Sequence, residues 1–226
     1  MKTSPWDFIL SGLTLLSLSG LVLWMIALLD PWLKTWLGDF HILAAGGLFL
    51  VLFGLGASAI THLLIRTRPL QPGDYTMNHQ QFTYWKLLTV IYEFGRGALL
   101  PFTTVFAKPL VEALFGAKLG AGVALGGRLA EPYLITVEDG AILGHNSVLT
   151  CHAITSGQII LRKIHVGPRA TVGVNVIIMP GVEIGADAVV AGGSVVPMNT
   201  KIPARELWGG IPARKLKDVT PSEVRA

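Results

Sequence analysis

Two long apolar runs lie near the start of the chain. Phe8–Leu29 contains no charged residue, and Phe40–Ile65 carries only His41 and His62 among its apolar side chains. At about 1.5 Å per residue, a helix over the first run measures about 33 Å, enough to cross about 30 Å of hydrocarbon. The link between the runs, residues 30–39, contains a proline that ends helices and two tryptophans that favour membrane interfaces. Residues 1–68 are therefore predicted to form a transmembrane helical hairpin.

A cleaved signal peptide is the alternative for the first run. The run is longer than the apolar core of a signal peptide, and no small-x-small cleavage site follows it. Lys2 precedes the first run, and Arg66 and Arg68 follow the second, against Lys34 alone in the link. This excess of positive charge predicts that both termini lie in the cytoplasm and that the hairpin is integral to the cytoplasmic (inner) membrane.

Residues 69–116 mix polar, charged and apolar positions. A polar stretch comes first, and the apolar residues that follow are interrupted by charges and prolines, namely Lys86, Glu93, Arg96, Lys108, Pro101 and Pro109. These interruptions disfavour a third span. We expect a linker and amphipathic helices that lie in the membrane interface. A buried helix that caps the following domain is the competing interpretation.

A six-residue period governs the second half of the chain. Every sixth residue is a branched aliphatic at Val166, Val172, Ile178, Ile184, Val190 and Val196, and the same phase holds at Leu119, Leu125, Val137, Leu143 and Leu149. Neither a helix of about 3.6 residues per turn nor a flat strand keeps this period. A three-faced prism does, with aliphatics inside, small residues at the corners and glycine relieving the bends. We predict a left-handed parallel β-helix of about five turns over residues 117–203, with a β-sandwich as the alternative and 204–226 as a C-terminal tail.

Composition and charge support this division. Hydrophobic residues make up 51% of the 226 residues and charged residues only 14%, whereas soluble domains usually carry about a quarter. The net charge is +4, and the segment that ends at Ile65, with two Lys and three Asp, is net negative. The one cysteine, Cys151, cannot form an intrachain disulfide. A disordered chain, a disulfide scaffold and an ordinary soluble enzyme are therefore excluded, and we expect no nucleic-acid partner.

The end of the repeat resembles that of hexapeptide-repeat acyltransferases. Ile178–Val196 followed by Trp208–Arg214 is similar to the stretch that closes this family with a Gly-Asn-Pro-Ala-basic motif. Phe115–Gly120 and Leu134–Gly140 look like a membrane-linked branch, as in the tail of poly-lysine synthetase-like proteins. The resemblance implies acyl-CoA bound between the subunits of a homotrimer. We therefore expect transfer of an acyl group, with acetyl as the first candidate, although the sequence does not determine the length of the acyl chain.

The resemblance also implies residues for the acyl-CoA site. The backbone at Gly173, Ala191 and Gly192 matches positions that approach the pantetheine arm. Arg214 and Lys215 would pair with the CoA phosphates. The alternative for these two cations is a solvated basic tail near anionic lipid headgroups.

Three of the six histidines, His145, His152 and His165, lie close together in the sequence. Acyl transfer needs a base for the acceptor proton, and histidine titrates near neutral pH. The resemblance places that base at His152, with an outward-facing solvated histidine as the alternative. His145 is a second catalytic candidate, and His145 and His165 either help to position the substrate or have no role. Glu138 stands where the family usually has Gly, and the loop after the base is short at Thr155–Lys163. A short loop leaves room for a large acceptor, such as an envelope glycan or a lipid-linked precursor.

The sequence is compatible with two rival functions. Gly144–Leu149 looks like a zinc-ligand segment of γ-type carbonic anhydrases, but their second histidine, five residues after His145, is Thr150 here. Because the ligand spacing fails, we expect no metal. The other rival is a non-catalytic membrane scaffold that has kept the fold.

Overall fold

The computed structural model describes residues 4–220 and divides into two compact units. The helical unit comprises the chain up to Leu70 together with Asn78–Thr103. The β-helical unit comprises Gln71–Met77 and the chain from Thr104 onward. Lys2, used above for the orientation, and residues 221–226 of the expected tail lie outside the described residues.

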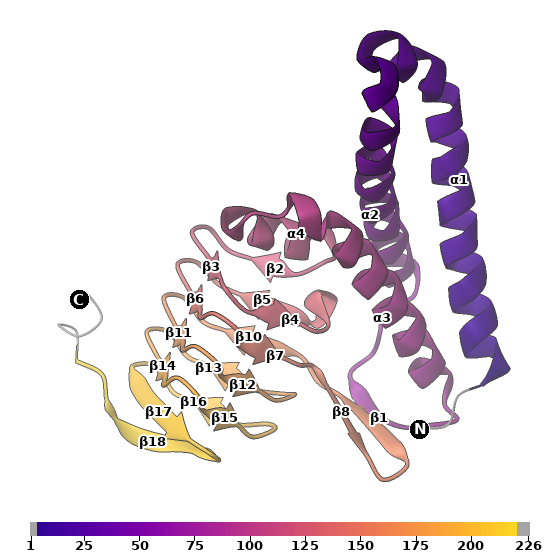
Figure 1. Ribbon diagram of the computed structural model, residues 1–226. Coiled ribbons are helices and arrows are strands. Elements are labelled where there is room, and N and C mark those ends of the chain that lie inside the picture. Colours follow the sequence, from indigo (N-terminus) through magenta and orange to yellow (C-terminus); the bar gives the residue numbers. More distant parts are fainter. Residues whose placement is uncertain (1–3, 221–226) are drawn as a thin grey trace. The chain divides into compact units, whose positions relative to one another are not determined.

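The helical unit contains three long helices (Figure 1): α1 (Pro5–Leu37), α2 (His41–Thr67) and α3 (Gln80–Leu99). Ser4 caps α1 in a capping box with Asp7. The expected helix end at Pro31 is wrong, because α1 continues to Leu37 and a 3-10 turn, η1 (Gly38–Phe40), joins it to α2. Gly38 makes this turn with a φ of 53°, which glycine adopts without strain. Within residues 4–220 one helical segment, Pro5–Thr67, is long and apolar enough to cross a membrane.

Small residues let the three helices approach closely. A side chain at Gly56 would meet Leu18 of α1 at 2.5 Å, and one at Gly54 would meet the carbonyl oxygen of Gly95 of α3 at 3.0 Å. Apolar helices commonly pack in this way through small residues. Helix α3 is buried against α1 and α2, since Phe82, Leu88, Ile91 and Tyr92 are fully inaccessible. The structure thus places α3 in a helix bundle rather than as a separate interfacial helix.

A lysine of α3 pairs with an aspartate of α1. Lys86 Nζ contacts Asp7 Oδ2, both side chains are about nine-tenths buried, and the ammonium also lies 4.3 Å from the centroid of the Phe82 ring. Each of the two buried charges thus has a partner of opposite charge, as buried ions require. The charge of Lys86, which disfavoured a third span in the sequence, therefore has an internal partner.

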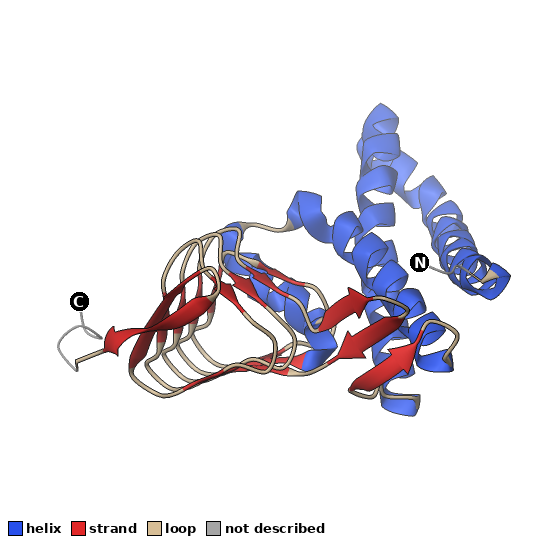
Figure 2. Ribbon diagram, turned by 90° about the horizontal axis from the view of Figure 1, so that it is seen from below, coloured by secondary structure: helices blue, strands red, loops and turns tan. Residues whose placement is uncertain are grey.

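The β-helical unit is a stack of coils with three parallel faces (Figure 2). The first face contains β2 (Lys118–Leu119), β5 (Ile135–Val137), β10 (Ile164–Val166), β13 (Glu183–Ile184) and β16 (Lys201–Ile202). The second contains β3 (Ala124–Leu125), β6 (Ile142–Leu143), β11 (Thr171–Val172), β14 (Val189–Val190) and β17 (Glu206–Gly210). The third contains β4 (Arg128–Leu129), β7 (Val148–Leu149), β12 (Ile177–Ile178) and β15 (Val195–Val196).

The expected roles of the aliphatic positions are confirmed, but the role of the glycines differs. Val166, Val172, Ile178 and their equivalents are at most 3% exposed, apart from Leu119, which is half-buried. The glycine after the aliphatic does not relieve a bend. A side chain at Gly144 would lie 2.6 Å from the Gly173 carbonyl carbon, so glycine is needed for contact between coils. The bend comes two residues later, where φ is positive at Asn146, Arg169, Asn175, Asp187, Asn199 and Arg205.

The ends of the stack extend beyond the predicted limits. Helix α4 (Lys108–Leu114) covers the first coil next to β2 and β3, which agrees with the capping interpretation for that part of 69–116. At the other end, β17 joins the second face in parallel, so the stack continues past residue 203. Strand β18 (Ala213–Asp218) then turns back antiparallel to β17.

The irregular turn between Leu149 and Val166 is a hairpin that leaves the coils. It consists of β8 (His152–Thr155) and β9 (Gln158–Leu161), where a loop was expected over Thr155–Lys163. Strand β1 (Gly73–Thr76) pairs antiparallel with β9 and makes a three-stranded sheet.

Candidate functional site

The clearest constellation of polar side chains joins His152 to a buried carboxylate. His152 is the first residue of β8, at the point where the chain leaves the third face. Its Nδ1 lies 2.5 Å from Oε1 of Glu131, which precedes the short 3-10 helix η4 (Pro132–Leu134). The His152 side chain is 29% exposed, whereas that of Glu131 is 1% exposed. The imidazole thus has access to solvent while its orienting partner has none.

Further bonds hold this pair. The backbone N–H of Cys151 donates to the other Glu131 oxygen at 2.8 Å. The Thr150 hydroxyl donates to the His152 carbonyl at 3.0 Å, and its oxygen lies 3.1 Å from His152 Nδ1. A carboxylate so placed holds the proton on Nδ1, which leaves the lone pair on Nε2. The arrangement suits a general base with a fixed tautomer.

Glu131 was not identified from the sequence, although the repeat contains a signal for it. Counting by six from Leu119 and Leu125 to Val137, position 131 should carry an aliphatic. The chain there takes Leu129 inward instead, opposite Leu149, and Glu131 falls in the bend that follows. An acidic residue at a position that the period assigns to the interior marks a buried carboxylate, which needs a partner.

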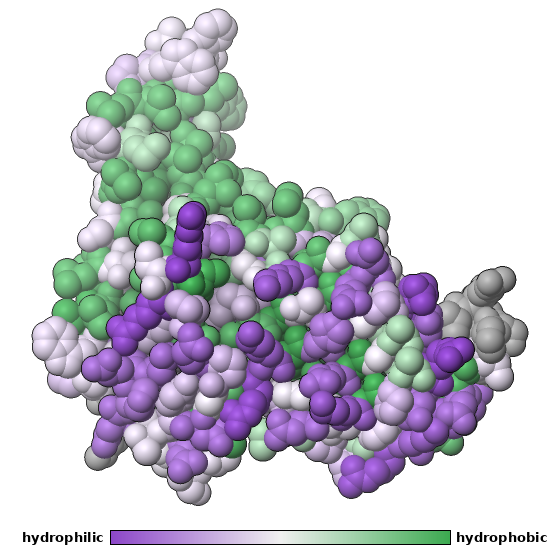
Figure 3. Space-filling view, turned by 180° about the vertical axis from the view of Figure 1, so that it is seen from behind, coloured by the Kyte–Doolittle hydropathy of each residue, from purple (hydrophilic) through white to green (hydrophobic). Residues whose placement is uncertain are grey.

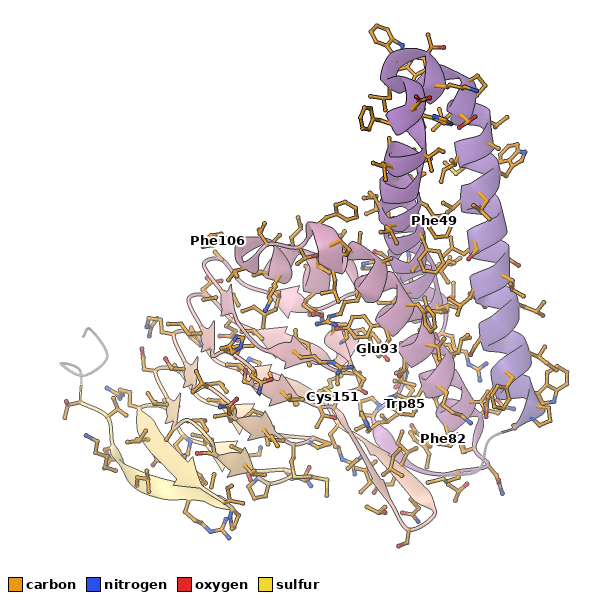
Figure 4. The ribbon with its side chains drawn as sticks, viewed as in Figure 1. Phe49, Phe82, Trp85, Glu93, Phe106 and Cys151 are labelled. Carbon is orange, nitrogen blue, oxygen red and sulfur yellow. The ribbon has the colours of Figure 1, made fainter. Side chains whose placement is uncertain are left out.

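The neighbouring thiol is not suited to be a nucleophile. Cys151 is buried, and its Sγ lies 3.8 Å from the carbonyl oxygen of Leu134 (Figure 4). Burial, and next to it the charge of Glu131, raise the pKa of the Cys151 thiol well above its usual value. Because the thiolate is the reactive form, we expect this thiol to react slowly in the folded protein.

The other two candidate histidines lie elsewhere on the coils. His145 is exposed at the corner between the second and third faces, next to Asn146, and its carbonyl accepts from the Asn175 N–H. His165 lies in β10 on the first face, and its Nε2 is 2.8 Å from Glu138 Oε1 with both side chains nearly half exposed. The structure therefore does not bring the three histidines together within one chain.

The residues expected at the pantetheine arm lie together on one corner. Gly173 and Gly192 stack on successive coils, since a side chain at Gly173 would meet the Gly192 nitrogen at 2.6 Å. Ala191 precedes Gly192, and its Cβ would lie 3.2 Å from a side chain at Gly209 one coil further on. The contact between coils by itself requires glycine at 173, so this requirement does not identify a ligand.

The two expected phosphate-binding cations lie on β18. Arg214 is exposed, and its Nη1 donates to the Ala213 carbonyl at 3.0 Å. Lys215 Nζ contacts both Glu206 Oε1 and Asp218 Oδ1 at 2.7 Å. These carboxylates raise the pKa of Lys215 and compete with any phosphate for its ammonium. Arg214 is therefore the better placed of the two.

The described residues, 4–220, contain no cluster of three histidine, cysteine or acidic side chains that could hold a metal ion within one chain. The position five residues after His145 is Thr150, whose hydroxyl is engaged with His152.

Comparison with known proteins finds relatives for the coils. No protein-family model matches the chain. The chain is 34% identical over 88 residues to the mitochondrial gamma carbonic anhydrase 2 of Arabidopsis thaliana. The aligned segment covers 39% of this chain and 27% of that protein. It is 30% identical over 140 residues to the carnitine operon protein CaiE of Escherichia coli, and this alignment covers 54% of the chain and 68% of CaiE. The chain thus spans about a quarter of the length of the carbonic anhydrase and two thirds of CaiE.

Among solved structures, a galactoside acetyltransferase in complex with coenzyme A shares the fold. The two superpose with a TM-score of 0.52 at 18% identity, over 72% of this chain and 92% of that one. The galactoside acetyltransferase thus shares the fold of the coils. The match to CaiE, at 30% identity over two thirds of that protein, together with the six-residue β-helix, shows that the chain belongs to the hexapeptide-repeat acetyltransferase family.

Proposed function

We propose that the protein is a membrane-anchored acyltransferase that moves an acetyl group from acetyl-CoA to a hydroxyl or amine of an acceptor. The observation that carries this proposal is the Glu131–His152 pair, an oriented and accessible imidazole backed by a buried carboxylate. The family to which the chain belongs supplies the reaction class.

In this mechanism His152 Nε2 takes the proton from the acceptor O–H or N–H. The acceptor oxygen or nitrogen attacks the thioester carbonyl, and the C–S bond breaks. The imidazolium of His152 then gives the proton to the CoA sulfur, so that CoA leaves as the thiol and His152 is again neutral. Glu131 keeps Nδ1 protonated and stabilises the imidazolium that forms. The buried position of Glu131 strengthens this electrostatic contribution, because water does not screen it.

Gly173, Ala191 and Gly192 would line the pantetheine arm, and Arg214 would meet a CoA phosphate. Lys215 would have to leave Glu206 and Asp218 to do the same. For the acceptor we propose an envelope glycan or a lipid-linked precursor, since the β8–β9 hairpin is short.

Membrane anchoring is supported by the surface of the helical unit. Large apolar side chains point outward along α1 and α2, including Leu16, Leu43 and Leu63, and Figure 3 shows apolar side chains gathered over the helices. Exposed apolar area of this extent is unfavourable in water and favourable in lipid. We propose that α1 and α2 span the inner membrane with the β-helical unit in the cytoplasm, and that Phe106, which is 93% exposed, lies at the lipid surface.

A homotrimer is supported by the difference between the three faces. The first face presents Lys118, Glu183 and Lys201 outward, whereas the second and third present mostly aliphatics such as Ile142 and Ile177. Association through the two aliphatic faces would bury them and leave the charged face in solvent. Ile177→Glu is expected to lower the mass measured by light scattering of the detergent-solubilised protein.

Release of CoA from acetyl-CoA tests the proposed function. The detergent-purified protein is assayed with host membrane extract as acceptor, beside His152→Ala and, as a matched control, His145→Ala. Release that depends on the extract and is lost only in His152→Ala is expected, and labelled acetyl then identifies the acceptor. Release that survives in His152→Ala would remove the base from the mechanism.

The similarity to the carbonic anhydrase favours one second candidate, a zinc enzyme whose ligands come from two chains. Zinc content and CO₂ hydration by the same sample test it. Stoichiometric zinc lost in His145→Ala would support this candidate, whereas CoA release from metal-free protein would contradict it.

A further inference from the structure

A strand from the linker between α2 and α3 completes the sheet that carries His152. Strand β1 pairs antiparallel with β9, with Gly73 opposite Leu161, and Leu161 in turn is opposite His152 on β8. Just beyond the strand, the Met77 N–H donates to the Gly157 carbonyl at 3.2 Å. The base, the middle strand and the linker strand thus share one row across the sheet.

An ion pair reinforces this pairing. Arg162 Nη2 lies 2.7 Å from Asp74 Oδ1, and Arg162 Nη1 donates to the Leu161 carbonyl at 2.9 Å. The backbone N–H of Arg162 donates to the Cys151 carbonyl at 2.9 Å, directly before His152. One arginine therefore contacts β1 with its side chain and the start of β8 with its backbone.

The β8–β9 hairpin by itself has only two strands. An isolated two-stranded hairpin is marginally stable in water, and a third strand is normally needed. Strand β1 is that third strand, and Ile159 and Leu161 of β9 are fully buried. Along the chain, β1 belongs to the β-helical unit, whereas the residues up to Leu70 and from Asn78 belong to the helical unit.

We infer that β1 positions His152 for acyl transfer, with Asp74 and Arg162 as positioning residues. This inference rests on the proposed function and adds a part of the chain outside the hexapeptide repeat to the site. Displacement of a general base by about 1 Å can slow the reaction by up to about 100-fold. Without β1, the hairpin would move more freely and would position His152 less accurately.

The register identifies variants that separate strand pairing from side-chain loss. Amides of an antiparallel strand point alternately toward and away from the partner. The Met77 amide bonds to Gly157, the residue directly before β9, so by alternation the Tyr75 amide points toward β9 and the Thr76 amide points away. Tyr75→Pro removes a donor from the ladder, Thr76→Pro removes an amide that does not serve it, and Tyr75→Ala controls for the lost ring.

Hydrogen exchange of the full-length protein in detergent measures the pairing directly. We expect the amides of residues 152–161 to exchange about tenfold faster in Tyr75→Pro, because loss of one ladder bond in a three-stranded sheet leaves a marginal hairpin. Thr76→Pro and Tyr75→Ala should retain the exchange rates of the wild type.

Kinetics then separate positioning from general destabilisation. In Tyr75→Pro, kcat should fall about tenfold with the KM for acetyl-CoA unchanged. Asp74→Arg should lower kcat, and Asp74→Arg combined with Arg162→Asp should restore it, since the pair is re-formed with reversed charge.

Equal exchange rates and equal kcat in Tyr75→Pro and Thr76→Pro would overturn the inference. If kcat falls in Asp74→Arg and the charge-reversed double variant does not recover it, the Asp74–Arg162 ion pair plays no part in positioning His152. Absence of transfer by the wild type would instead overturn the proposed function, and the exchange rates alone would then decide whether β1 holds the hairpin.

Discussion

Replacing Glu131 by glutamine tests the proposed base without changing its size. In the structure Glu131 Oε1 lies 2.5 Å from His152 Nδ1, and its other oxygen accepts from the Cys151 N–H at 2.8 Å. Glutamine can keep the bond from Cys151 through its carbonyl oxygen. Its NH₂ group then faces Nδ1, which can accept from it only when the imidazole proton has moved to Nε2. The variant therefore favours the tautomer that lacks the basic nitrogen toward the acceptor.

The size of the effect follows from what is lost. A positioned general base contributes about 10²–10⁴ in rate, and Glu131→Gln removes both the correct tautomer and the charge that stabilises the imidazolium. We expect kcat to fall about 10³-fold, which is about 4 kcal/mol in the activation barrier. The KM for acetyl-CoA should not change, because Glu131 follows β4 of the third face, whereas the pantetheine is expected at the corner that follows the second face.

Steady-state release of CoA from the detergent-purified variants measures this effect. Glu138→Gln is a matched control, because the same chemical change is made at an exposed carboxylate 2.8 Å from His165. If Glu131 and His152 act as a unit, the double variant with His152→Ala should be no slower than His152→Ala alone. Activity of Glu131→Gln within threefold of wild type, or multiplicative losses in the double variant, would refute the reasoning.

Three further predictions concern stability and reactivity. Gly173→Ala should lower the free energy of unfolding by about 1–3 kcal/mol in thermal melts, since its Cβ would meet the Gly192 nitrogen at 2.6 Å. Arg169 donates two hydrogen bonds of 2.7 Å to the Asp187 carboxylate, which hold the pKa of Asp187 below its usual value of about 3.9. These bonds therefore stabilise the folded protein above about pH 3.9, and this stabilisation is lost as the pH falls through the lowered pKa. Asp187→Asn should therefore lower Tm at pH 7, and the difference in Tm from the wild type should shrink as the pH falls below about 3.9 and vanish once the pH is below the lowered pKa. Cys151 should react with iodoacetamide at least about 100-fold faster in urea than in the folded protein, because burial protects the thiol and raises its pKa.

The coils were predictable because their physical determinant is local and periodic. An inward aliphatic at each sixth position defines the stacking, so Val166, Ile184 and Ile202 align on one face as the period requires. The glycine role was misjudged for a reason that the sequence alone does not contain. Gly144 faces the backbone of Gly173 on the next coil, and only the coil-to-coil distance shows that a side chain cannot fit there.

Helix α3 illustrates a second limit. The charges of Lys86 and Glu93 disfavoured a third membrane span and favoured helices in the membrane interface. Lys86 is nevertheless buried because Asp7, 79 positions earlier, supplies its counter-charge. Pairs at such separations leave no periodic trace in a single sequence, so α3 could be predicted as a helix but not placed.

The two interruptions of the six-residue period contain the candidate site. At the first, Glu131 occupies a position that the period assigns to an aliphatic, and at the second, the irregular step from Leu149 to Val166 begins at His152. Each interruption alone is a local departure from the six-residue period. The stacking of adjacent coils brings Glu131 and His152 together, with 2.5 Å between Glu131 Oε1 and His152 Nδ1. A chain selected only for stacking would have kept an aliphatic at 131 and a hexad at 152, since a buried carboxylate costs stability. Departures from an otherwise regular pattern that meet in space are where function is expected. Two breaks in one repeat should therefore be compared for chemical complementarity before either is dismissed as a loop.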